Sequence, residues 1–113
     1  MISLIKWGIL AVCLLAGSVP VFGTELDDND RLRLALDLGT LIGSEKQCGF
    51  NYEQQAIRAY IDQRVPVDDI SFVRNLNMFT RGMSRDIEQM SESAKTAHCE
   101  QIHRATRAVG FLQ

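Results

Sequence analysis

The sequence predicts an all-α protein, a small three- to four-helix bundle with one disulfide, preceded by a signal peptide. Apolar residues recur at steps of three or four in four segments, which is the spacing of one helix face. Capping residues, glycines and a proline punctuate those segments. Three cysteines are present, and two of them, Cys48 and Cys99, follow the apolar start of the chain. The length of 113 residues suits a single folded domain.

Residues 1–23 have the pattern of a secretory signal peptide. Lys6 precedes an apolar run at 7–15, and Pro20 follows before the roughly 20 apolar residues of a membrane span are reached. Cleavage is expected after Gly23, which leaves a helical domain of residues 24–113. Two alternatives are a lipoprotein modified at Cys13, which lacks the small residue that should precede the cysteine, and an uncleaved membrane anchor.

The charge of the expected mature chain argues against two classes of partner. Export leaves 11 basic and 14 acidic residues, a net charge of −3, and the arginines are scattered among carboxylates. Nucleic acids and anionic membranes require clustered Lys and Arg, so neither is expected as the main partner. Stable membrane insertion after cleavage is not expected either.

The first helix is expected over residues 31–43, capped by an acidic or Asn residue at 28–30 and ended by Gly43. Alternating leucines at 32–38 would also suit a strand. Helix is favoured because Ala, Leu and Arg are strong helix formers. Whether this helix packs in the bundle is left open.

The second helix is expected to follow a turn at 44–50 that holds Cys48. Asn51 is in the N-cap position with Gln54 three residues later, the spacing of a capping box. The helix must end near Arg64, because Pro66 disfavours helical geometry at Val65.

The third and fourth helices have the clearest periodicity. Asp68 or Asp69 caps the third, whose apolar seam consists of Ile70, Val73, Leu76, Phe79, Met83, Ile87 and Met90. Gly82 interrupts the seam, which predicts a kink or a close helix contact there. Ser91 or Ser93 caps the fourth helix, and Gly110 followed by Phe111 fits a glycine C-cap. Short connections predict an antiparallel bundle.

A Cys48–Cys99 disulfide is expected to tie the segment 93–111 to the rest of the bundle. It would close a loop of about 50 residues, for which the chain-entropy estimate is about 4 kcal/mol. Removal of either cysteine is therefore expected to cost more stability than any single core truncation.

Other chemistry for the cysteines is less well supported by the pattern. Cys48, Cys99 and His103, with Glu100 or His98 as a fourth ligand, could bind zinc, but the usual CxxC and HxxxH pairs are absent. A nucleophilic thiol would need a base, and His98 points about 100° away from Cys99 around the helix. Both histidines are expected to be solvated or helix-flanking. We expect no catalytic residue, no cofactor and no metal.

The remaining candidates have structural explanations. Asp68 and Asp69 are expected to cap a helix and not to act as an acid–base pair. A methionine-rich face could bind a partner, although core packing is favoured for its members Phe72, Met78, Phe79 and Met83.

Three segments carry a resemblance to known sequences: GSEKQCG at 43–49, DDISF at 68–72 and SESAKTAHC at 91–99. With these segments the chain resembles small exported two-cysteine proteins of alphaproteobacteria, including rhizobia. The resemblance implies a periplasmic or secreted location and no catalytic residue. More loosely, the layout is similar to the acid-stress chaperones of the enteric periplasm.

These observations predict an exported helical protein, not an enzyme, that binds an unknown protein partner, in envelope stress or host association. One alternative is a metal- or thiol-active protein that uses Cys48, Cys99 and His103. Another is an acid-triggered chaperone in which protonation of carboxylates loosens the bundle, the candidates being Asp62, Asp69, Asp86 and Glu88.

Overall fold

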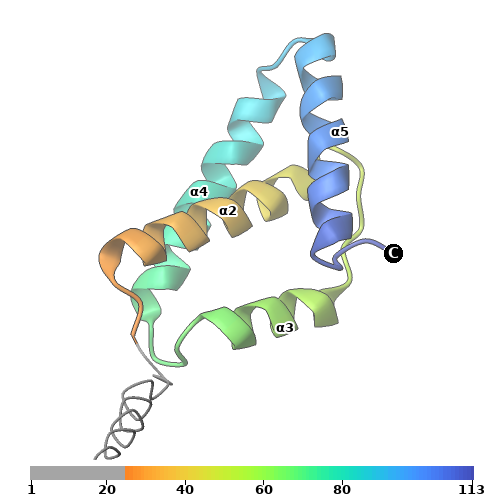
Figure 1. Ribbon diagram of the computed structural model, residues 1–113. Helices are drawn as coiled ribbons and strands as arrows, with labels where there is room; N and C mark the ends of the chain where they lie inside the picture. Colours follow the sequence, from red (N-terminus) through yellow and green to blue (C-terminus); the bar gives the residue numbers. More distant parts are fainter. Residues whose placement is uncertain (1–24) are drawn as a thin grey trace, which may run out of the picture.

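The computed structural model describes residues 25–113, which fold into four α-helices (Figure 1). They are α2 (Asp28–Glu45), α3 (Gln54–Arg64), α4 (Ile70–Glu88) and α5 (Glu92–Ala108). The predicted all-α fold and the Cys48–Cys99 disulfide are both confirmed. The predicted signal peptide, its cleavage site and Cys13 lie outside the described residues.

Helix α2 is the central element, and its chain direction is the same as that of α4, which it crosses at an angle. Arg31 in the first turn of α2 contacts Asp69 at the start of α4, and Gln47, just after α2, donates to Glu88 at the end of α4. In Figure 1, α2 crosses α4 while α3 carries the chain back beneath them. The expectation of a purely antiparallel bundle is therefore wrong for this pair, because α3 serves as the return connection between two parallel helices.

Two glycines let the backbones of α2 and α4 approach closely. A Cβ atom added to Gly39 would lie 2.8 Å from Cβ of Phe79, and one added to Gly43 would lie 2.6 Å from the carbonyl oxygen of Thr80. The interpretation of Gly43 as the end of the first helix is wrong, because α2 continues to Glu45. Gly39 and Gly43 lie four residues apart, on one face of the helix.

Replacement of Gly43 by alanine is expected to destabilise the fold by about 1–3 kcal/mol through overpacking, although alanine is the better helix former. Gly82 in α4 is the matched control, since a Cβ there would meet no atom within 4 Å. The predicted close contact at Gly82 is thus wrong, and Gly82→Ala should stabilise by about 0.5–1 kcal/mol. Urea denaturation midpoints measure both changes. Equal effects of the two substitutions would contradict close packing at Gly43.

The core lies where α2, the start of α4, the turn before α3 and the end of the chain meet. Its fully or nearly buried apolar residues are Ala35, Leu38, Tyr52, Phe72 and Phe111. The hydroxyl of Tyr52 donates to the carbonyl of Leu41 at 2.7 Å. Burial, with a smaller effect of the Glu45 charge, raises the pKa of Tyr52, so the phenol stays protonated.

The buried stripe of α4 begins at a different residue from the predicted seam. Ile70 and Val73 are 68% and 51% exposed, whereas Phe72 is only 1% exposed. Phe72 is the residue that continues the helical spacing back from the inner residues of the seam, Leu76, Phe79, Met83 and Ile87. At the start of α4, apolar residues lie on two neighbouring stripes of the helix, one with Ile70 and Val73 and one with Phe72. Only the packing against α2 decides which of the two is buried.

The helix ends follow local chemistry more closely. Asp69 and Ser91 cap α4 and α5, as predicted, by accepting from backbone N–H groups three residues later. Asp27 caps α2, one residue before the predicted range. The capping box at Asn51 is wrong, because α3 has Glu53 at its N-cap and begins at Gln54.

Candidate binding surfaces and the disulfide region

The disulfide joins the turn after α2 to the middle of α5. The two sulfurs are 2.00 Å apart and the Cα atoms 5.5 Å apart. Beside the bond lies a surface hollow of about 410 Å³, lined also by Phe50, Glu100 and His103. In this form neither sulfur is a free thiol for zinc or for nucleophilic attack. Within residues 25–113, no three His, Cys, Asp or Glu side chains are grouped so that they could hold a metal ion.

Both histidines are partly buried and contact residues outside α5, whereas they were expected to be solvated or helix-flanking. The ring of His103 lies 5.6 Å from that of Phe50. Nε2 of His98 lies 2.9 Å from the hydroxyl of the buried Ser44. Since that hydroxyl donates its one proton to the Thr40 carbonyl, Nε2 of His98 is the donor in the second contact. His98 thus fastens α5 to α2.

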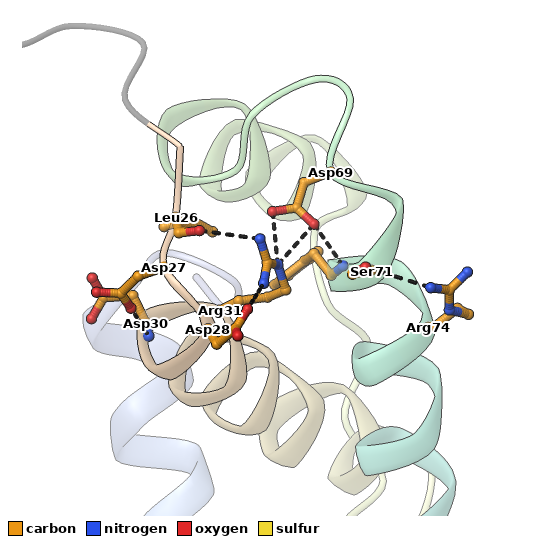
Figure 2. A network of polar contacts seen from close by, with 9 residues as sticks. Leu26, Asp27, Asp28, Asp30, Arg31, Asp69, Ser71 and Arg74 are labelled. Carbon is orange, nitrogen blue, oxygen red and sulfur yellow. Dashed lines mark hydrogen bonds and ion pairs between the residues drawn. The ribbon is translucent and has the colours of Figure 1, made fainter.

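An arginine–aspartate pair joins the starts of α2 and α4, as Figure 2 shows. Nε of Arg31 donates to both carboxylate oxygens of Asp69 at 2.9 Å. The same guanidinium donates to Asp28 at 2.7 Å and to the Leu26 carbonyl at 3.1 Å. One oxygen of Asp69 also accepts from the N–H of Phe72 at 3.0 Å. Asp69 therefore caps α4 and fixes it to α2.

The sequence indicated the cap but not its partner. Arg31 and Asp69 are 38 residues apart, and no local spacing links them. The only available signal was an arginine near the start of an amphipathic helix, which is too common to single out a pair.

The pair shifts the pKa of both side chains. Partial burial alone would raise the pKa of Asp69, but the hydrogen bonds from Arg31 and from the Phe72 N–H, with the charge of Arg31, outweigh it and lower the pKa. The hydrogen bond to Asp69 is the main reason that the pKa of Arg31 is raised. The ionised pair is thus favoured in the folded state.

Asp69 is expected to make stability fall in acid. The pKa of Asp69 in the folded protein lies below its ordinary value of 3.8. Its contribution to the free energy of unfolding is therefore complete above about pH 3.8 and is lost as the pH falls through the lowered pKa. Asp69→Asn should therefore be less stable than wild type at neutral pH, and the difference should shrink below about pH 4. Urea midpoints across pH measure this effect.

Asp28→Asn is the control, since Asp28 contacts the same arginine but its side chain is 95% exposed. It should change the midpoint much less. A difference in urea midpoint between wild type and Asp69→Asn that persists unchanged at pH 2 would contradict the assignment.

Of the other carboxylates proposed as acid triggers, Glu88 accepts from Gln47, while the side chains of Asp62 and Asp86 make no hydrogen bond or ion pair with any described residue.

An apolar groove lies along the line where α2 meets α4. Leu32 and Leu36 are 44% and 47% exposed, and they line a hollow of about 460 Å³ together with Phe79, Asn29 and Arg33. Leu32 and Leu36 are one helical turn apart, so they present one apolar strip. We call this site the α2–α4 groove. Its apolar centre and polar rim are typical of binding sites.

The sequence placed the candidate partner-binding face elsewhere. Of the methionine-rich face, Phe72 is buried, Phe79 and Met83 are partly buried, and Met78 is 51% exposed. Phe79 borders the groove, but the exposed leucines Leu32 and Leu36 come from α2. The alternation of these leucines with Leu34 and Leu38 was the feature of the sequence that could have indicated a second apolar face. Alternating leucines in a helix place apolar side chains on two faces, and the core of a small domain can cover only one of them.

Comparison of the chain with protein-family models, with curated proteins and with solved structures finds no significant match. In residues 25–113, no helix is both long and apolar enough to cross a lipid bilayer.

Proposed function

We propose that this is an exported, non-enzymatic helical protein that binds an apolar segment of another protein in the α2–α4 groove. The observation that carries the proposal is the pair of half-exposed leucines, Leu32 and Leu36, on the most central helix of the fold. An apolar strip of this kind, bordered by polar side chains, marks an interaction site.

The shape of the groove favours a helical segment as the occupant. The two leucines are about 6 Å apart along α2, which matches one turn of a partner helix. Phe79 stands beside them, and Asn29 and Arg33 supply polar contacts at the rim. An amphipathic helix with apolar residues at positions i and i+4 can lay that strip between Leu32, Leu36 and Phe79.

The disulfide supports the cellular setting of this proposal. Disulfides persist in oxidising compartments, so the Cys48–Cys99 bond fits a periplasmic or secreted protein, as do the predicted signal peptide and the resemblance to exported alphaproteobacterial proteins. Envelope stress and host association are the biological settings in which we place the partner.

Site-directed photo-crosslinking tests the groove. A photoreactive phenylalanine analogue at Leu36 of the exported protein should give one discrete adduct with a protein from envelope extracts. Leu32→Gln should abolish the adduct while changing stability by less than about 0.5 kcal/mol, since Leu32 is on the surface. Val109, which is 38% exposed on the far end of the chain, is the control position. Equal cross-linking from Val109, or no effect of Leu32→Gln, would contradict the proposal.

Acid-triggered chaperoning is a second candidate, favoured by the Arg31–Asp69 pair. Protonation of Asp69 would release the start of α4 and uncover the buried Phe72. Binding of a hydrophobic dye at pH 2–3 in the wild type, with an onset at higher pH in Asp69→Asn, would support it. A folded, dye-silent protein at that pH would exclude it.

The metal- or thiol-active alternative is tested by mass spectrometry and thiol titration of the exported protein. An oxidised Cys48–Cys99 pair with no adduct is expected. Two reactive thiols with bound metal would instead support a site formed with His103.

A further inference from the structure

We propose that the outer face of α4 is a second binding surface, which takes an acidic segment of a protein. Arg74, Met78, Arg81 and Arg85 follow one another at steps of four, three and four residues, so they lie on one face of the helix. All four side chains are exposed, Met78 by 51%. We call this set the arginine face; it extends about 16 Å along α4.

The three arginines have no carboxylate partner among residues 25–113. The ion pairs there involve Arg31 and Arg104. Arg74 makes only a 3.5 Å contact from Nη2 to the Ser71 hydroxyl, which Figure 2 shows pointing away from the Arg31–Asp69 pair. The arginine face therefore presents three cations whose guanidinium groups remain open to an external anion.

The carboxylates of α4 do not neutralise this face. Glu88 lies at the end of the helix, where it accepts from Gln47, and Asp86 follows Arg85 directly, so it points about 100° away around the helix axis. The arginines that looked scattered among carboxylates in the sequence are thus gathered on one side by the helical repeat.

Chemistry and size favour a short acidic protein segment over other polyanions. A guanidinium binds a carboxylate through two parallel hydrogen bonds, and the flexible Met78 between the arginines offers an adaptable apolar contact. An extended nucleic acid or an anionic bilayer would also meet the exposed acidic residues near both ends of α4, namely Asp68, Asp86 and Glu88. A segment about three helical turns long would contact the arginine face alone.

Fluorescence anisotropy tests the proposal with a labelled synthetic helical peptide that carries glutamates along one face and a leucine among them. The variant R74Q/R81Q/R85Q should bind it roughly tenfold more weakly and with a smaller dependence on salt, because each exposed ion pair contributes a modest factor. Met78→Gln should cause a smaller loss.

The matched control is R58Q/R104Q/R107Q, which removes three exposed arginines of α3 and α5 and changes the net charge equally. It should bind within about twofold of wild type. Leu32→Gln should also bind normally, so a failure of the α2–α4 groove would be distinguishable from a failure here. Circular dichroism should show unchanged helix content in every variant.

Three outcomes would overturn the proposal. The first is no binding of the peptide by wild type. The second is equal loss in the two triple variants, which would show an effect of net charge alone. The third is tighter binding to phosphatidylglycerol vesicles or to single-stranded DNA than to the peptide, which would assign the arginine face to a lipid surface or a nucleic acid.

Discussion

Replacement of Cys48 and Cys99 by serine is expected to lower the free energy of unfolding by about 4 kcal/mol, because the bond restrains a long loop in the unfolded chain. The two cysteines are 51 residues apart. In a domain of this size the total free energy of unfolding is typically about 5–15 kcal/mol, so the loss is a large share. Urea denaturation of the oxidised wild type and of the double variant measures the difference.

Removal of the disulfide should loosen α5 before the other helices. In Figure 1, α4 and α5 diverge from the turn that joins them, so α5 is held chiefly at its middle and at its far end. The middle is fastened by the disulfide and by the His98–Ser44 contact. When the bond is absent, the rate of amide hydrogen exchange should therefore increase more in α5 than in α2.

Chemical reduction provides the control. Dithiothreitol should lower the midpoint of the wild type to that of the double variant and should leave the variant unchanged. An unchanged midpoint of the reduced wild type would show that the bond does not support the fold.

Features set by near neighbours in the chain could be predicted from the sequence. Asp69 and Ser91 cap helices because their side chains reach a backbone N–H three residues later. Gly110 has a φ of 86°, which suits glycine, and the N–H of Phe111 bonds back to the Thr106 carbonyl at 2.8 Å, as a glycine C-cap requires. Each of these arrangements is complete within a few residues.

Features that depend on contact between distant segments could not be predicted. Gly43 had the local signature of a helix end, yet its role is to admit the backbone of α4. The disulfide ties the segment 93–111 to the rest of the fold as expected, but the sequence did not indicate that α2, which contacts both α4 and α5, occupies the centre. The Arg31–Asp69 pair and the α2–α4 groove likewise exist only because α2 and α4 run parallel, an arrangement that helix periodicity does not specify.

Phe111 is expected to be the most sensitive single position in the core. Its side chain is fully buried, with ring centroids 5.6 Å from Tyr52 and 5.7 Å from Tyr60. Its carbonyl accepts from the N–H of Glu53 at 2.8 Å, which joins the end of the chain to the start of α3. Phe111→Ala should lower the free energy of unfolding by about 3–5 kcal/mol, through lost burial and the cavity left behind.

The loss expected for Phe111→Ala overlaps the loss expected when the disulfide is removed. Phe111→Ala is therefore the strictest test of the prediction that removal of a cysteine costs more stability than any single core truncation. Val109→Ala, two residues earlier at a partly exposed site, is the control and should cost less than about 0.5 kcal/mol. Tyr52→Phe should cost about 1 kcal/mol, because it removes a single buried hydrogen bond and keeps the ring. If Phe111→Ala cost no more than Val109→Ala, the end of the chain would not belong to the core. If it cost more than the double serine variant, aromatic packing at the end of the chain, and not the disulfide, would be the principal restraint on α5.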